Sequence, residues 1–252
     1  MSVDSEMRVE LWLLGRPEHG RSAATLDLSI LDEEERHRAG TCRRSAGGAL
    51  YATAHIALRR LLGDRLCMPA AELFFVREPC PGCGEPHGRP ALAAPSADVH
   101  FSLSHSNGMV LIGIAGTPIG VDVEPVPRSE TVRICTPALH PAEREEVLAV
   151  PEGLPRRVAF GRLWTRKESY LKGIGTGLAR GLALDYLGDD PARRPPGWTV
   201  MDIPCGPHHC AATAIHGRGP VVPTVRRLSE QWLLAAEGSR PYGVRTASPK
   251  AA

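Results

Sequence analysis

The sequence predicts an α+β fold built from two similar halves in a single chain. Its 252 residues (27.1 kDa) suit one large domain or two small ones, and they suffice for a substantial hydrophobic core. Strand patterns and helix patterns follow one another twice in a similar order, without a sequence repeat of fixed period. We assign the halves to residues 1–117 and 118–228 and expect a loosely ordered tail over 229–252, where Gly, Ser, Ala and Pro are frequent.

The first half combines short strands with one long helical region. Apolar residues recur at helical spacing between residues 51 and 62, so residues 32–63 are predicted to be largely helical, with Arg59 and Arg60 on the face opposite the core. Residues 79–95 are rich in Pro, Gly and Cys and predict a loop, and Asn107-Gly108 predicts a tight turn. Strands are expected at 8–14, 72–76, 99–103 and 109–115.

The second half begins with a strand at 119–124, which Pro125 and Pro127 close. Helices are predicted at 141–150, where acidic residues fill the first turn, and at 158–172. Further strand-like segments lie at 182–187, 198–203 and 210–216.

Composition and charge exclude several classes of protein. Apolar residues make up 42% and charged residues 23%, as in ordinary globular chains. The net charge of +2 and the 5% of aromatic residues argue against a protein that wraps nucleic acid, so any bound anion must meet a local site. The longest strongly apolar run, residues 109–115, is too short to span a bilayer, and the N-terminus lacks the pattern of a signal peptide. We therefore expect a cytoplasmic protein that does not bind membranes.

Two pairs of charged residues are candidates for catalytic chemistry. Asp122 and Glu124 alternate on a predicted strand, so their carboxylates share one face, and such hard oxygen ligands suit Mg²⁺; a solvated strand face is the alternative. Glu168 and Lys172 are neighbours on a predicted helix, and Trp164 one turn earlier indicates that this face points inward. If the two pairs meet, they form a site for a metal and a phosphate together.

Two other motifs resemble known sites but fit them poorly. The glycines from Gly173 to Gly177 follow a helix rather than a strand and are better explained as a helix C-cap than as a phosphate loop. Ser104-His105-Ser106 lacks the G-x-S-x-G pattern of a hydrolase nucleophile, although a histidine and hydroxyls at a strand end can hold a phosphate.

Cysteines form one further motif. The chain has seven of them, and for a cytoplasmic protein we expect reduced thiols or metal ligands. Cys80 and Cys83 have the spacing of one zinc knuckle, which supplies two of the four ligands that a structural Zn²⁺ needs. The absence of a second C-x-x-C weighs against zinc. Any remaining ligands would come from His87, Cys205, His208, His209 or Cys210.

Taken together, three ordered motifs resemble the Sfp-type 4′-phosphopantetheinyl transferases. They are Gly88-Arg89-Pro90 with 101–106, then 119–124, then 164–172 with the glycines that follow. The resemblance implies a pseudo-dimeric fold with coenzyme A in the cleft between the halves. It also implies Mg²⁺-dependent transfer of the 4′-phosphopantetheine arm to a serine of an acyl or peptidyl carrier protein, with release of adenosine 3′,5′-bisphosphate.

The resemblance also implies a role for individual residues. Asp122, Glu124 and Glu168 would bind the metal, and Lys172 would contact the phosphates and the transferred group, with Lys167 nearby. Coenzyme A would be held by Ser104 and His105, with His105, Arg89 and, as a weaker match, Arg38 at the 3′-phosphate. The general base stays open between Glu143 and Glu168 acting through water.

Because both halves lie in one chain, we expect a monomer whose partners are coenzyme A and a carrier protein, not nucleic acid. Carriers of fatty-acid, polyketide and nonribosomal-peptide synthesis all fit. Two rival functions are another Mg²⁺-dependent enzyme acting on a nucleotide pyrophosphate and a zinc-knuckle module that binds nucleic acid.

Overall fold

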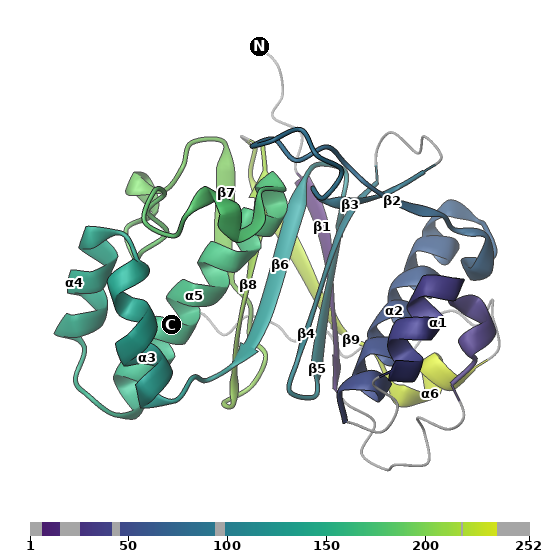
Figure 1. The fold of residues 1–252 in the computed structure, drawn as a ribbon, viewed down its shortest axis with the longest axis horizontal. Coiled ribbons are helices and arrows are strands. Elements are labelled where there is room, and N and C mark those ends of the chain that lie inside the picture. The colour runs from purple at the N-terminus through teal and green to yellow at the C-terminus, as the bar shows by residue number, and fades with distance from the viewer. Residues whose placement is uncertain (1–6, 16–25, 42–45, 94–98, 218, 236–252) are drawn as a thin grey trace.

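A computed structural model describes residues 7–15, 26–41, 46–93, 99–217 and 219–235. Two β-sheets pack face to face in the middle of the molecule, and helices cover the outer face of each (Figure 1). The resulting layers are helix, sheet, sheet and helix. None of the described helices has the length and apolarity that a bilayer crossing requires.

The first sheet belongs mainly to the N-terminal half. Its strands are β1 (Met7–Gly15), β4 (His100–Ser106), β5 (Met109–Ala115) and β9 (Val221–Arg227), in the order β4-β5-β1-β9. β1 pairs antiparallel with β5 and parallel with β9. Its outer face is covered by α2 (Ala46–Leu66), with α1 (Glu33–Thr41) and α6 (Glu230–Leu234) beside it (Figure 1).

The second sheet has the order β6-β8-β7, with β6 (Ile119–Pro125), β7 (Trp198–Asp202) and β8 (His209–His216) all antiparallel to their neighbours. The long helix α5 (Leu154–Ile174) lies across its outer face, flanked by α3 (Ser129–Cys135) and α4 (Pro141–Ala149) (Figure 1). Strand alternation divides β6 between two environments. Val121 and Val123 join the core between the sheets, whereas Gly120 and Asp122 face α5.

Smaller elements complete the chain. β2 (Phe75–Arg77) and β3 (Pro90–Leu92) form a two-stranded antiparallel ribbon whose connecting loop covers residues 78–89. Single 3₁₀ turns occur at Leu28–Ile30, Ala70–Glu72, Thr136–Ala138, Gly177–Arg180 and Pro191–Arg193.

β4 and β6 lie side by side but belong to different sheets. Serine side chains, instead of a ladder of backbone hydrogen bonds, connect the two strands. The hydroxyl oxygens of Ser102 and Ser104 accept hydrogen bonds from the backbone N–H groups of Val121 (3.0 Å) and Val123 (3.3 Å), and Ser106 donates to Glu124 (2.7 Å). We call this contact, made by Ser102, Ser104 and Ser106, the serine seam.

Most predicted elements are confirmed. β5 has the predicted bounds, and Asn107 (φ 44°) and Gly108 (φ 88°) form the predicted turn. The strand predicted at 182–187 is wrong. Two backbone carbonyls of that segment, those of Leu182 and Asp185, accept hydrogen bonds from the buried Lys167 ammonium, so they are not available to a sheet.

The predicted domain boundary also needs correction. β9 lies within the range assigned to the second half, yet it pairs with β1 of the first sheet. α6 lies within the predicted tail, yet Trp232 and Leu233 are 5% and 4% exposed in the core beside α2. The Arg60 guanidinium stacks on the Trp232 ring, and this contact stabilises the packing of α6 against α2. Residues 236–252 of the predicted tail lie outside the described residues.

Candidate active site

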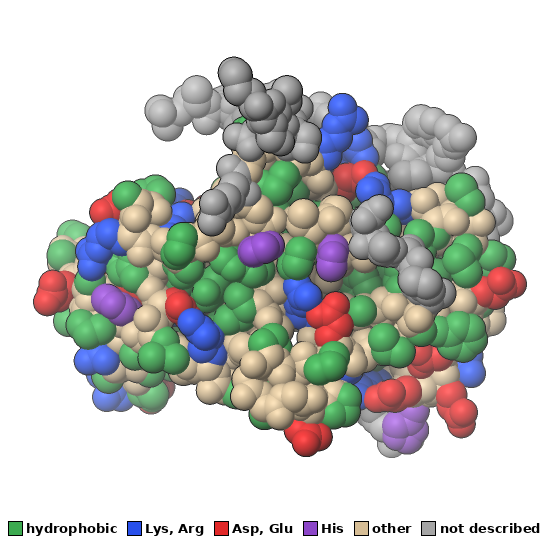
Figure 2. All heavy atoms as spheres, turned by 90° about the horizontal axis from the view of Figure 1, so that it is seen from above, with side chains coloured by type: hydrophobic (Ala, Val, Ile, Leu, Met, Phe, Trp, Pro, Cys, Tyr) green, Lys and Arg blue, Asp and Glu red, His purple; other side chains and the backbone are tan. Residues whose placement is uncertain are grey.

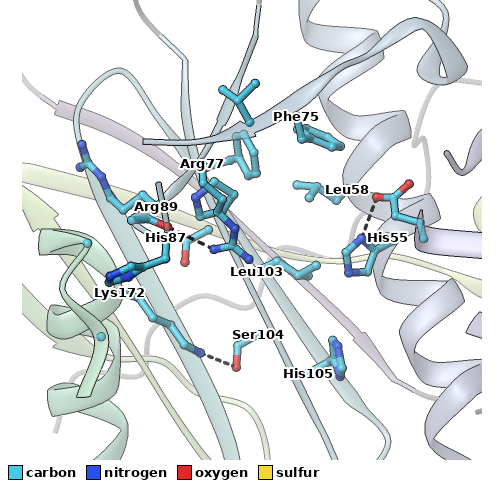
Figure 3. Close-up of a pocket in the computed structure, with 18 of the residues that line it drawn as sticks. His55, Leu58, Phe75, Arg77, His87, Arg89, Leu103, Ser104, His105 and Lys172 are labelled. Carbon is cyan, nitrogen blue, oxygen red and sulfur yellow. Dashed lines mark hydrogen bonds and ion pairs between the residues drawn. The ribbon is translucent and has the colours of Figure 1, made fainter. Parts of the chain in front are cut away.

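A cavity of about 760 Å³ lies between the two halves. One wall comes from α1, α2 and β4, the other from the C-terminal end of α5, and the 75–90 ribbon and loop complete it (Figure 3). On the face of the molecule seen in Figure 2, basic, acidic and histidine side chains lie among hydrophobic ones. The cavity therefore combines charges of both signs with an apolar surface formed by Leu58, Phe75, Phe101 and Leu103.

Lys172, Asp122 and Ser104 form a compact polar cluster beside this cavity. The Lys172 ammonium donates to Asp122 Oδ1 (2.6 Å) and to Ser104 Oγ (3.1 Å), and the Ser104 hydroxyl donates to Asp122 Oδ1 (2.9 Å). Asp122 is 2% exposed, and its second oxygen, Oδ2, is buried without a hydrogen-bond partner. An unsatisfied carboxylate oxygen in a buried position is costly, which makes it a candidate ligand for a cation.

Close contact between β6 and α5 brings these residues together. A Cβ built on Gly120 would lie 1.9 Å from the carbonyl oxygen of Ser169, and only glycine permits that approach. Gly173 faces Gly120 across the same contact. Glu168 and Lys172, one helical turn apart, consequently lie against the strand face that carries Asp122.

Glu124 and Glu168 add two more carboxylates to the cluster. Burial raises the pKa of Glu124, the neighbouring Asp122 raises it further, and the Ser106 hydroxyl and Lys172 oppose these effects. Burial is also the main cause of the raised pKa of Glu168, with Asp122 and Glu124 adding to it and Lys172 opposing. Three carboxylates face one lysine, so a divalent cation would neutralise the excess negative charge. Within the described part of the chain, their oxygens do not yet form a compact set of metal ligands.

His105 lines the cavity next to this cluster, and its ring packs edge-on against Tyr51 with 5.9 Å between centroids. Burial lowers the pKa of His105, and the neighbouring His55 and Lys172 lower it further. The neutral imidazole is therefore favoured at neutral pH.

Ser104 lines the cavity and also belongs to the polar cluster. Its hydroxyl donates to Asp122 and accepts from Lys172 and from the backbone of Val123, which uses its whole hydrogen-bonding capacity. In this arrangement Ser104 joins Asp122 to Lys172.

Arg89 and Arg38 both line the cavity. Arg89 donates from Nε and Nη2 to Glu78 (2.9 and 2.6 Å) and from Nη1 to the carbonyl of Gly173 (3.0 Å), so it ties the 78–89 loop to the end of α5. Arg38 is exposed and pairs with Glu34 one turn earlier on α1. Arg89 thus lines the cavity and also connects the 78–89 loop to α5. Arg38 lies at the rim of the cavity.

Glu143 and Lys167 do not reach the cavity, and the roles predicted for them are wrong. Glu143 is fully buried, accepts from the backbone N–H groups of His140 and Leu187, and pairs with Lys167 at 2.8 Å. Burial lowers the pKa of Lys167 although Glu143 opposes this effect. Lys167 precedes Lys172 by five residues, about 140° around the helix, so it faces α4 and not the cavity.

The sequence patterns did not predict several of the residues that line the cavity. Glu35, Tyr51, His55, Arg77 and His87 all line it. Glu35 accepts from Arg59 (2.6 Å) and interacts with His55 Nδ1 (2.8 Å). Arg59 was predicted on an exposed face but is 0% exposed. The spacing of Tyr51, His55 and Arg59, four residues apart on α2, could have revealed this polar stripe.

Comparison with known proteins places these observations in a family. The family model described as the 4′-phosphopantetheinyl transferase superfamily matches residues 118–199, the segment that contains Asp122, Glu124, Glu168 and Lys172.

Curated relatives agree with this match. The 4′-phosphopantetheinyl transferase HetI of Nostoc sp. is 29% identical over 170 residues, 64% of this chain and 68% of the relative. A 4′-phosphopantetheinyl transferase of Bacillus subtilis is 31% identical over 159 residues, 60% of this chain and 66% of the relative. The L-aminoadipate-semialdehyde dehydrogenase-phosphopantetheinyl transferase of Eremothecium gossypii is 30% identical over 197 residues, 73% of this chain and 67% of the relative. The chain belongs to the 4′-phosphopantetheinyl transferase superfamily, enzymes that transfer the 4′-phosphopantetheine arm to carrier proteins.

Proposed function

We propose that the cavity binds coenzyme A and that the cluster around Lys172 transfers its 4′-phosphopantetheine arm to a serine of a carrier protein. One observation carries this proposal. Asp122, with its unpartnered Oδ2, lies with Lys172, Glu124 and Glu168 at the junction of the two halves. The cavity beside them is large enough for an extended cofactor and has basic groups at its rim.

Coenzyme A carries a pyrophosphate and a 3′-phosphate, and the cavity offers partners for both. Lys172 is 34% exposed at its side chain and directs its ammonium toward the polar cluster, which suits the pyrophosphate. Arg89 keeps two N–H groups beyond its three hydrogen bonds, and His105 and Arg38 lie in the same cavity. These three residues are the candidates for contact with the 3′-phosphate.

Three carboxylates fit a magnesium ion by charge and by ligand chemistry. The ion would be held by Glu124, by Glu168 and by the unpartnered Oδ2 of Asp122. When bound, Mg²⁺ would withdraw charge from the pyrophosphate oxygens and favour a leaving group that departs as adenosine 3′,5′-bisphosphate.

The chain's own residues would then act as follows. The carrier serine oxygen bonds to the phosphorus of the phosphopantetheine phosphate, and the bond from that phosphorus to the bridging oxygen breaks. Lys172 donates hydrogen bonds to the non-bridging oxygens, where negative charge must be stabilised. The serine proton passes to Glu168 through water. Glu168 lies beside Asp122 and Lys172, so it belongs to the cluster in which the reaction takes place. Ser104 connects Asp122 to Lys172 through its hydroxyl.

The direct test is to incubate the protein with coenzyme A, Mg²⁺ and a panel of apo carrier proteins from fatty-acid, polyketide and nonribosomal-peptide synthesis. We expect at least one carrier to gain the mass of the arm while adenosine 3′,5′-bisphosphate appears in equal amount. Glu168→Gln should lose the reaction. Glu145→Gln, an exposed residue on α4, is the matched control and should keep it. Cleavage of coenzyme A without a carrier would instead support the rival pyrophosphate enzyme.

We propose further that the enzyme is monomeric and acts in the cytoplasm, where coenzyme A is available. The cavity draws its walls from both halves of one chain, so a second copy is not needed to complete it. Light scattering should give the mass of one chain, and a dimer would contradict the proposal.

A further inference from the structure

The loop between β2 and β3, residues 78–89, is ordered without an apolar core of its own. Residues 81–87 are all exposed, and only Cys80 and Gly88 are buried. The backbone nevertheless folds back on itself: Cys80 N–H donates to the Glu85 carbonyl and Gly84 N–H donates to the Cys80 carbonyl, each at 2.8 Å. A loop of this length with so little buried apolar surface needs another source of stability.

Three potential metal ligands meet at the tip of this loop. The Sγ atoms of Cys80 and Cys83 and one ring nitrogen of His87 lie within 4.8 Å of one another, and Cys83 Sγ is 2.9 Å from His87 Nε2. Tetrahedral zinc with Zn–S near 2.3 Å and Zn–N near 2.0 Å requires donor atoms about 3.6–3.8 Å apart. The three atoms therefore need only small adjustments to bind a single ion.

The backbone of the loop also suits a metal site. The Cys80 carbonyl accepts a hydrogen bond from the Gly84 N–H, so the chain turns back within four residues. Gly84 adopts φ +80°, the left-handed conformation that this turn requires. The turn brings Cys83 and His87 close to the Cys80 sulfur atom.

We propose that this chain binds one Zn²⁺ through Cys80, Cys83 and His87, with water in the fourth position. Within the described part of the chain, no fourth His, Cys, Asp or Glu joins the cluster. Of the additional ligands considered from sequence, His87 is present, whereas Cys205 and Cys210 are buried in the second half. The site is independent of the carboxylate cluster at Asp122.

A metal at this position would act on the cavity through the chain that follows it. His87 lines the cavity and immediately precedes Gly88 and Arg89 (Figure 3). Gly88 N–H and Glu78 N–H each take part in backbone hydrogen bonds that close the base of the loop, and Arg89 connects that base to the Gly173 carbonyl. Zinc at the tip would therefore fix the loop that holds the end of α5 next to Lys172.

Zinc content tests this proposal without any measurement of enzyme activity. The full chain is purified without chelator or metal-affinity resin, exchanged into metal-free buffer and analysed for metals. We expect about one zinc per chain, because two thiolates and one imidazole on a short loop hold the ion through three protein ligands. Cys83→Ser and His87→Gln should each lower the content to below about one tenth. Cys67→Ser, an exposed free cysteine outside the cluster, is the matched control and should retain zinc.

Two further measurements separate zinc from its alternatives. Replacement by Co²⁺ should give the sulfur-to-cobalt charge-transfer absorption of a tetrahedral thiolate site, which Cys83→Ser should remove. Alkylation under denaturing conditions followed by mass spectrometry counts free thiols. A Cys80–Cys83 disulfide in the freshly purified protein, or a folded wild type that takes up no zinc even when zinc is supplied, would overturn the proposal.

Discussion

The two walls of the cavity both bury charged side chains, but they satisfy them differently. On the α2 wall, Arg59 donates to Glu35 and Asp32 and to the carbonyls of Ala70 and Leu73, and each carboxylate oxygen of Glu35 has a partner. On β6, beside the α5 wall, Asp122 Oδ2 has no partner among the described residues. A fully satisfied network holds the fold together, whereas a buried oxygen without a donor indicates where a ligand belongs.

Asp122→Asn should have the largest effect on activity. Removing the charge takes away a proposed metal ligand and the partner of Lys172, so we expect turnover to fall by about 1000-fold, equivalent to about 4 kcal/mol. The free energy of unfolding should hardly fall, because the amide keeps the shape of the carboxylate and relieves an unsatisfied charge. Steady-state kinetics and urea denaturation measure the two quantities, and normal turnover in a folded variant would refute the assignment.

Arg59→Met should show the opposite pattern. Arg59 is completely buried, and its loss leaves Glu35 without its main donor. Breaking a buried ion pair by removing one partner costs about 3–5 kcal/mol. We expect that loss in urea denaturation at neutral pH, and a cost below about 1 kcal/mol would mean that the α2 network is not part of the framework.

His105 offers a test of where anions bind. Burial lowers its pKa below the ordinary value of 6.5 in the free protein, so the folded state binds fewer protons than the unfolded chain and this group's contribution to stability rises with pH through that range. A phosphate at His105 should raise the pKa again and couple coenzyme A binding to proton uptake, with affinity falling as pH rises. NMR titration with coenzyme A and with dephospho-coenzyme A measures this coupling. If both ligands shift the pKa of His105 equally, the residue does not contact the 3′-phosphate.

Arg89→Ala should have the smallest effect of the four. Three of its five donors already serve Glu78 and Gly173, so the variant mainly loosens the 78–89 loop. We expect a loss of roughly tenfold in kcat/KM for coenzyme A, about 1.4 kcal/mol, and a smaller loss for dephospho-coenzyme A, which lacks the phosphate that the two remaining N–H groups would contact. Glu78→Ala should reproduce only the loss that both substrates share. Equal losses of Arg89→Ala on both substrates would show that Arg89 does not contact the 3′-phosphate.

Short-range patterns predicted the polar cluster well. The strand period of two put Asp122 and Glu124 on one face, and the helical period linked Glu168 to Lys172. Such periods say nothing about whether a charged residue faces a cavity or a buried partner. Glu143 and Lys167 were therefore misassigned, because only tertiary packing reveals that they neutralise each other in the core.

Contacts between residues far apart in the sequence were harder to predict. β9 contains Pro223 and ends in Arg226 and Arg227, a composition that argues against a central strand, yet its pairing only with β1 at the sheet edge accommodates the proline. That pairing joins residues more than two hundred positions apart, which no local pattern can indicate. The fold of each half was thus predictable, and the way the chain returns to its first sheet was not.

The serine seam has a mechanical consequence. Sliding one strand past another in a continuous sheet breaks a whole row of backbone hydrogen bonds, but β4 and β6 are joined by a few hydroxyls that can rotate and exchange partners. Shear between β4 and β6 therefore breaks only a few hydrogen bonds. Ser104 also holds Asp122 and Lys172, so a small slip of β4 would reposition both charges at once. A ligand that pushes the walls of the cavity apart would in this way adjust the reactive groups as it enters.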